Sequence, residues 1–254
     1  IIKNPVLQRT EYEQLEKQAV EAFYDHLKVK KITWTEHIEN VQYVDQSSIG
    51  KTPRSCPATF IWVFDDMRKL YAGVTEAKML WFTSWHFSFN SGKWACPECN
   101  GYGTKLIELQ FLPDTYIDCE LCRWKRYKPE ILDIKRHGKS ISELLSMYVM
   151  DALDFFQDIG FIREKLQLMV DIGLWYLRMG QPAHTLSGGE SQRLKLVKHL
   201  LKIYKGHTVY FLDEPTVWLH PNDIERLLKV LKKFLDNGDT VLMIEHEKNL
   251  LQFA

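Results

Sequence analysis

Two closely spaced cysteine pairs place the strongest constraint on how this chain can fold. Cys96 and Cys99 form one C-x-x-C turn, and Cys119 and Cys122 form another after nineteen intervening residues. Structural Zn²⁺ is held by four ligands at the corners of a tetrahedron, and each such turn supplies two thiolates. Four protein ligands leave no position for a catalytic water. We therefore expect the four cysteines to surround one structural Zn²⁺.

Redox dithiols or incidental thiols are the weaker interpretation of the same cysteines. Two matched pairs at this spacing are hard to explain in that way. The fifth cysteine, Cys56, stands apart from both pairs. We expect it to be a small buried thiol rather than a reactive one.

A basic stretch follows the second cysteine pair. Seven basic and two acidic side chains between residues 123 and 139 give a local charge of +5, with Trp124 and Tyr127 interleaved. Cations beside aromatic rings suit phosphate contacts combined with base stacking. The residues predicted to contact DNA are Arg123, Lys125 and Arg126. The alternative is a solvated surface strip without a ligand.

The composition of the whole chain limits its class. Lys+Arg and Asp+Glu both number 33, which excludes a uniformly basic nucleic-acid binder but not a local basic strip. Hydrophobic residues make up 45% of the chain, enough for a substantial core. The sequence has no apolar run of membrane-spanning length and no opening signal peptide. We expect a cytoplasmic protein without a membrane partner.

The last third of the chain has the clearest secondary-structure pattern. Apolar runs at 208–212 and 240–244 predict buried parallel strands. Between them, 222–235 predicts an amphipathic helix, and 191–204 predicts another before the first strand. Together they predict an α/β core with a βαβ unit. Upstream, we predict a helix over 11–30, a strand over 40–44 and two helices across about 140–180.

A glycine-rich motif, LSGGESQR, opens the helix predicted at 191–204. Its glycines let the backbone approach a ligand closely, and a helix N-terminus attracts anions. We predict that Ser187, Gly188 and Gly189 bind nucleotide phosphates. Ser187 and Glu190 also fit an S-x-x-E capping box. The two interpretations are compatible, but a capping box alone does not need paired glycines.

Two carboxylates end the strand predicted at 208–212. Asp213 and Glu214 would lie at the carboxyl end of a parallel sheet, where α/β proteins bind ligands. Asp213 suits a Mg²⁺ shell, and Glu214 suits positioning or deprotonating an attacking water. His246 follows the second strand and is placed to donate to a γ-phosphate. Taken singly, each would more often be an ordinary loop charge or surface histidine.

These motifs resemble those of ABC ATPases. LSGGESQR resembles the ABC signature, YFLDEP resembles Walker B, and His246 resembles the switch histidine. Gln46, in VDQSSIGKTPRS, resembles the glutamine that follows an early strand of that class. Over about residues 36–254 the chain resembles the UvrA family in particular. The resemblance rests on VDQSSIGKTPRS, the inserted double C-x-x-C module, ELQFLPD (108–114), KRY (125–127) and MGQPAHTLSGGE (179–190).

The resemblance implies an α/β fold: an ABC-type nucleotide-binding core with a helical signature subdomain and a zinc-binding insertion. The core would comprise 1–60 and 186–254. The signature subdomain would comprise 61–185, with the zinc module at about 93–130. The residues expected to act on ATP and Mg²⁺ in their own domain are Gln46, Asp213, Glu214 and His246. Those expected to face ATP held by a partner domain are Ser187, Gly188 and Gly189.

The function implied by the resemblance is ATP-dependent recognition of DNA damage in bacterial nucleotide excision repair. The implied partners are DNA, a second UvrA-like nucleotide-binding domain or subunit, and a UvrB-like repair protein. One alternative is a non-enzymatic fragment that binds zinc and DNA. Another is the ATPase subunit of an ABC transporter, which the zinc insertion argues against.

The sequence departs from this family at several positions. The Walker A pattern GxxxxGK[ST] is absent, because Asp45 stands where Gly50-Lys51-Thr52 would need a preceding glycine. Trp124 and Trp218 stand where the family tends to have glycine, and Cys56 stands where it tends to have asparagine. We expect this chain alone to hydrolyse ATP at a negligible rate.

Overall fold

The computed structural model describes residues 37–50, 52–90, 92–107, 115–202, 204, 206–216, 219 and 221–246, the last range without the side chains of 221–223. The chain divides into two compact units, Ile1–Glu39 and Asn40–Ala254, and the elements named below belong to the second. The predicted helix at 11–30, the string at 108–114 and Trp218 lie outside the described residues.

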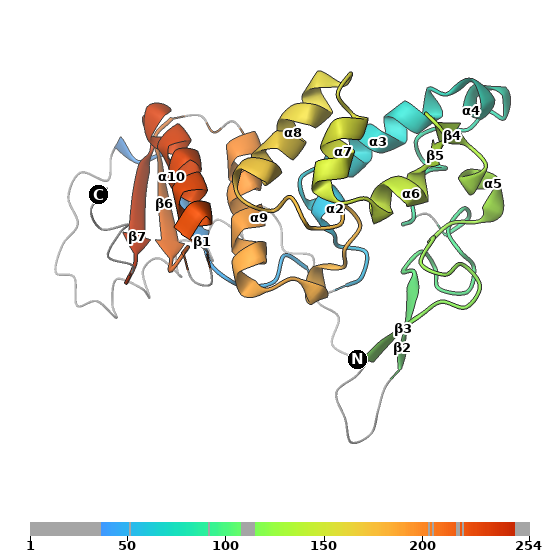
Figure 1. Ribbon diagram of the computed structural model, residues 1–254, viewed down its shortest axis with the longest axis horizontal. Helices are drawn as coiled ribbons and strands as arrows, with labels where there is room; N and C mark the ends of the chain where they lie inside the picture. Colours follow the sequence, from blue (N-terminus) through green and yellow to red (C-terminus); the bar gives the residue numbers. More distant parts are fainter. Residues whose placement is uncertain are drawn as a thin grey trace. The chain divides into compact units, whose positions relative to one another are not determined.

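Three parallel strands form the sheet of this unit (Figure 1). They are β1 (Asn40–Val44), β6 (Thr208–Asp213) and β7 (Thr240–Ile244), in the order β1-β6-β7. All three predicted strands are confirmed. Because the strands are parallel, their carboxyl ends share one edge, where Val44 pairs with Leu212 and Asp213 pairs with Ile244.

The expectation that the last strand is buried is wrong in part. In β7, Leu242 is 47% exposed and Ile244 is 52% exposed. Val241 and Met243, which alternate with them, pack against the core. This alternation shows that one face of β7 is covered by the described residues and the other face is open.

Helix α10 (Pro221–Asp236) connects β6 to β7, which confirms the predicted βαβ unit. Its apolar residues at Leu227, Leu231 and Phe234 are buried. The Phe234 ring lies 4.3 Å from the ring of Tyr210 on β6. The spacing of apolar side chains therefore holds the crossover helix against the sheet.

Helix α9 (Gly188–Leu201) lies between the sheet and the other helices, contacting both β1 and α8 (Figure 1). It begins three residues before the predicted helix, because Ser187 caps it: the Ser187 Oγ accepts from the Glu190 backbone N–H at 3.2 Å. The Glu190 carboxylate in turn accepts from the Ser187 N–H at 2.8 Å. The predicted capping box is thus confirmed.

A group of helices fills the middle of the unit. Three helices, rather than the predicted two, span 140–180. The bounds are α2 (Pro57–Phe60), α3 (Val63–Ala72), α4 (Thr75–Met79), α5 (Pro129–Leu132), α6 (Ile141–Ser146), α7 (Val149–Phe155), α8 (Gly160–Asp171) and the 3-10 turn η2 (Ala183–Thr185). No helix in the described part of the chain has the length and apolar character needed to cross a bilayer.

Two short hairpins complete the unit. One joins β2 (Thr104–Ile107) to β3 (Thr115–Asp118), and the other joins β4 (Lys135–Arg136) to β5 (Lys139–Ser140). The β2–β3 pairing sets Thr104 opposite Asp118, immediately before Cys119. This hairpin therefore brings the two distant cysteine pairs together.

Candidate metal centre and nucleotide-binding edge

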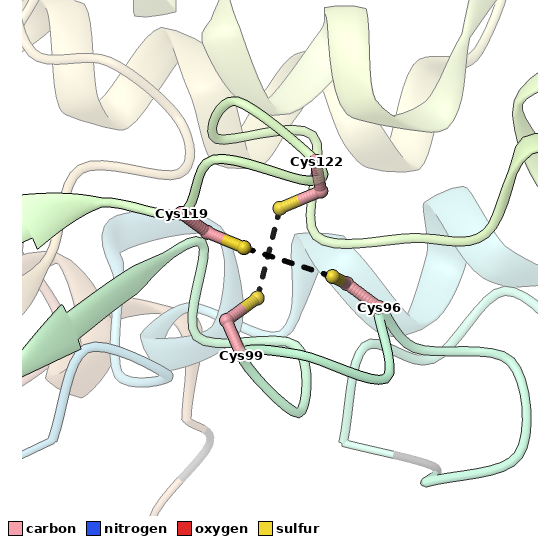
Figure 2. A group of neighbouring side chains, drawn as sticks. All are labelled: Cys96, Cys99, Cys119 and Cys122. Carbon is pink, nitrogen blue, oxygen red and sulfur yellow. Dashed lines mark hydrogen bonds between the residues drawn. The ribbon is translucent and has the colours of Figure 1, made fainter.

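The four paired cysteines converge in one buried cluster (Figure 2). Their Sγ atoms lie within 4.8 Å of one another, with Cys96 to Cys119 at 3.8 Å and Cys99 to Cys122 at 3.6 Å. A tetrahedral zinc with ~2.3 Å bonds separates its sulfurs by about 3.8 Å. A disulfide needs a separation of about 2 Å. The arrangement is therefore compatible with a structural zinc site and not with disulfides.

The two cysteine turns have the same local construction. The Gly103 N–H donates to the Cys99 Sγ at 3.2 Å, and the Arg126 N–H donates to the Cys122 Sγ. In each turn the donor follows its cysteine by four residues. Backbone N–H groups aimed at sulfur favour the thiolate, which is the form that binds a metal.

Burial opposes ionisation of Cys96, Cys119 and Cys122. It raises the pKa of the Cys119 thiol to about 11, and it also raises the pKa of Cys122. At Cys96, burial likewise acts to raise the pKa, but backbone hydrogen bonds from Cys99 and Glu98 outweigh it and lower the pKa. A bound cation would supply the charge that lets all four thiols ionise together.

Glu98 is a residue of this centre that the sequence analysis did not single out. Its Oε2 accepts from the Leu121 backbone N–H at 3.0 Å, and its other oxygen pairs with Lys105. Glu98 thereby ties the first cysteine turn to the second. Its position inside the first C-x-x-C turn was the only sequence signal.

A second group of predicted residues meets at the carboxyl edge of the sheet. Asp213 ends β6, Glu214 follows it, and His246 follows β7. The His246 Nε2 lies 3.4 Å from the Glu214 Oε1, with Glu214 half-exposed and His246 exposed. The Glu214 N–H donates to the Ile244 carbonyl at 2.9 Å. The edge therefore presents an open carboxylate and imidazole pair, with Asp213 beside it and partly exposed.

Two further residues hold this edge together and were missed from the sequence. The Glu245 Oε1 accepts from the Thr216 N–H at 2.8 Å and from its hydroxyl at 2.6 Å. The Gln192 side-chain amide donates to the Asp213 carbonyl at 2.6 Å and to the Val44 carbonyl at 3.1 Å. Gln192 thus docks α9 onto the ends of β1 and β6.

The glycine-rich motif lies beside the same edge. An ideal Cβ at Gly188 would stand 3.1 Å from both the Cβ and the Oε1 of Gln46. Gln46 and Gly188, which the resemblance assigns to two different nucleotides, are therefore in contact within one chain. Ser187 is exposed at the N-terminus of α9.

Comparisons with known proteins find relatives of this chain. The chain is 51% identical to UvrABC system protein A of Halalkalibacterium halodurans over 225 residues, which cover 89% of the chain and 24% of that relative. It is 47% identical to UvrABC system protein A of Oceanobacillus iheyensis over 252 residues, 99% of the chain and 26% of the relative. The crystal structure of UvrA2 from Deinococcus radiodurans matches with a TM-score of 0.81 and 41% identity, over 90% of this chain and 28% of that one.

The chain belongs to the UvrA family. It spans about a quarter of the length of the curated relatives it matches. A scan against protein-family models finds no match.

The structure shows the surroundings of Trp124 and Cys56, two positions where the chain departs from the residues expected for the family. Trp124, at a position where UvrA proteins tend to have glycine, has φ 68°, in the left-handed region that favours glycine. Cys56, where they tend to have asparagine, is fully buried at the N-cap of α2. Asparagine is among the best N-cap residues. The backbone at both positions therefore suits the residue that the family resemblance leads us to expect there.

The UvrA-like string KRY (125–127) corrects one expectation. Arg123 and Lys125 are exposed, as phosphate contacts require. Arg126 and Tyr127 are buried, each 2% exposed, and cannot present their side chains to DNA in this conformation. The Arg126 Nη2 donates to the Gly180 carbonyl at 3.0 Å, and the Tyr127 hydroxyl donates to the Phe87 carbonyl at 2.8 Å. The assignment of Arg126 to DNA contact is therefore wrong.

Proposed function

We propose that this chain is part of the ATP-dependent subunit that recognises DNA damage in bacterial nucleotide excision repair, working in the cytoplasm. The observation that carries the proposal is the shared sheet edge of Asp213, Glu214 and His246 in a chain about half identical to UvrA proteins. Because the chain spans about a quarter of those relatives, we assign it a share of the reaction rather than the whole.

The edge residues have separate roles in ATP hydrolysis. Glu214 positions the attacking water and accepts its proton. His246, in contact with Glu214, faces the γ-phosphate, and Gln46 completes the polar rim at the end of β1. Asp213 would be a ligand of Mg²⁺, which when bound would neutralise charge on the phosphates. Both carboxylates are partly open to solvent, as such a shell requires.

The signature motif serves a different nucleotide. Ser187, Gly188 and Gly189 open α9, and free N–H groups at a helix N-terminus attract phosphate. In the proposed assembly they complete the ATP site of a second UvrA-like nucleotide-binding domain or subunit. The four-cysteine site holds one structural Zn²⁺ through Cys96, Cys99, Cys119 and Cys122.

DNA lies along the zinc module. Arg123 and Lys125 are exposed and line a surface cavity of about 790 Å³, together with Lys128. Glu120, Glu130 and Asp133 line the same cavity, so the attraction depends on the two exposed cations rather than on net charge. Downstream, a UvrB-like repair protein receives the damaged DNA.

The DNA proposal is tested by the salt dependence of duplex binding. In the double variant Arg123→Glu/Lys125→Glu, the slope of log K against log salt should flatten by about two units, because each lost phosphate contact removes roughly 0.9. The matched control is Lys229→Glu/Lys232→Glu on α10, which makes the same charge change on another exposed surface. Equal slopes for the two double variants would place the DNA site elsewhere.

A further inference from the structure

Arg126 joins three parts of the molecule that are far apart in sequence. Its backbone N–H donates to the Cys122 Sγ, and its carbonyl accepts from the Cys96 N–H at 2.8 Å. Its guanidinium donates to the Gly180 carbonyl at 3.0 Å. Arg126 thus contacts both cysteine turns and the segment of chain that precedes α9.

The charge of Arg126 needs an explanation. The side chain is 2% exposed, and its Nη1 is buried without a hydrogen-bond partner. None of the ion pairs in the described part of the chain includes Arg126; its guanidinium lies 4.8 Å from the centre of the Phe89 ring. A buried cation without a counter-charge is strongly disfavoured.

The cysteine cluster can supply the missing counter-charge. Four thiolates around Zn²⁺ carry a net charge of −2. Burial lowers the pKa of Arg126, and the groups whose negative charge would oppose this are Cys56 and Tyr127, followed by Cys99 and Cys122. Of these four, Cys99 and Cys122 belong to the cysteine cluster. A zinc-loaded centre would therefore place an anion beside Arg126, whose backbone already contacts both cysteine turns, and the guanidinium would offset half of its excess charge.

The other end of this contact lies in a tightly held segment. The Gly180 N–H donates to the Leu145 carbonyl at 2.6 Å, and an added Cβ at Gly180 would stand 2.9 Å from that carbonyl oxygen. Three residues later, the Ala183 N–H donates to the Ser55 carbonyl at 2.8 Å. Ser187, the cap of α9, follows four residues after Ala183. These hydrogen bonds anchor the segment that precedes the N-terminus of α9.

We propose that Arg126 is a positioning residue that couples the zinc centre to the segment 179–183 in front of the signature motif. Zinc occupancy and the order of that segment then depend on each other, since thermodynamic coupling acts in both directions. The inference rests on zinc occupying the four-cysteine site, which elemental analysis tests separately.

The test is hydrogen exchange at the Gly180 and Ala183 amides of the complete 254-residue chain, with and without zinc. Chelation of zinc should speed exchange at both amides by at least about tenfold. Arg126→Met, which removes the guanidinium but keeps an unbranched side chain, should produce the same increase with zinc bound. Chelation should then add little further in that variant, because the coupling has already been cut.

A second readout separates coupling from simple loss of packing. Zinc release to a competing chelator should be faster in Arg126→Met than in the wild type, and Arg126→Lys should restore slow release by restoring a cation. Lys93→Met, which removes an exposed cation three residues before Cys96, should release zinc as slowly as the wild type. If Arg126→Met does not fold, chelation of zinc from the wild type and from Arg126→Lys still tests whether zinc occupancy and order at 179–183 are coupled. Zinc-independent exchange at 179–183 in a zinc-containing wild type would overturn the proposal.

Discussion

At the scale of single residues, backbone conformation around the cysteine turns limits which side chains the chain accepts. Gly101 has φ 80°, and a Cβ there would stand 1.9 Å from the Phe89 carbonyl oxygen. Trp124 and Arg126 both have φ 68° without being glycine. A left-handed conformation costs about 1–2 kcal/mol per non-glycine residue. The second turn therefore carries strain that its contacts must offset.

Gly101→Ala should destabilise the protein by roughly 3 kcal/mol, because strain and a clash with backbone act together. Gly138→Ala is the matched control: φ is 76°, but no atom lies within 4 Å of the added Cβ. That variant should lose only about 1 kcal/mol. Urea unfolding of the two variants measures the difference. Equal losses would mean that the close approach of Phe89 to Gly101 is not present in solution.

The sequence predicted the roles of single residues only where the spacing between them along the chain determines their geometry. The two C-x-x-C turns fix their own geometry, so the four ligands could be named in advance. Arg126 and Lys125 are adjacent cations, and no charge pattern shows that one of them turns inward beneath Phe89. That outcome depends on the aromatic packing of residues 80–95, which has no periodic sequence signal.

At the scale of elements, α9 connects the sheet to the helical group, and its C-terminal turn contains a partly buried histidine. Burial, and then Lys198, Lys202 and Lys195, lower the pKa of His199 to about 4. Its Nδ1 lies 2.8 Å from the Tyr204 hydroxyl. Because the folded pKa lies below the unfolded value, the unfolded chain binds more protons between the two pKa values.

Stability should therefore fall as the pH is lowered through this window, with His199 accounting for roughly 2 kcal/mol between pH 7 and pH 5. In His199→Phe, which keeps a ring against Tyr204 and Tyr210, that part of the pH dependence should vanish. Denaturant unfolding at the two pH values gives the comparison. An unchanged pH dependence in His199→Phe would show that His199 is protonated in the folded state.

The sequence predicts where the strands begin and end better than it predicts which of their faces are buried. The strands β6 and β7 were predicted because short apolar runs followed by polar turns have few other interpretations, and β1 was predicted from a strand-like stretch that alternates polar and apolar residues. The open face of β7 was not, because Leu242 and Ile244 belong to a continuous apolar run that also fits a buried strand. The docking of α9 through Gln192 depends on tertiary contacts that no local pattern contains.

At the scale of the whole molecule, the four-cysteine cluster forms only when two cysteine turns separated by nineteen residues come together, so its metal content reports on the fold. Purified chain should contain one zinc per molecule by elemental analysis, and Cys119→Ser should lower that content sharply and destabilise the module. Structural zinc contributes about 10–16 kcal/mol of apparent binding free energy in small modules. Cys56→Ser is the control, since Cys56 lies outside the cluster. Zinc content near zero, or unchanged in Cys119→Ser, would exclude the site.

We propose that the sheet edge and the signature motif, Ser187-Gly188-Gly189, act on two different ATP molecules. The 254 residues contain Glu214 and Asp213 but no GxxxxGK[ST] loop, which supplies most of the cradle for the β- and γ-phosphates. The chain should therefore bind and hydrolyse ATP poorly by itself. Ser187 should act on ATP held by another domain.

The most direct test measures ATP hydrolysis by this chain mixed with a second UvrA-like nucleotide-binding domain that has an intact phosphate loop. We predict negligible turnover by the chain alone and a gain in the mixture. Ser187→Arg should abolish that gain, because the longer side chain blocks the N-terminus of α9, whereas Glu214→Gln should leave it intact. Robust turnover by the isolated chain that is lost in Glu214→Gln would contradict the account.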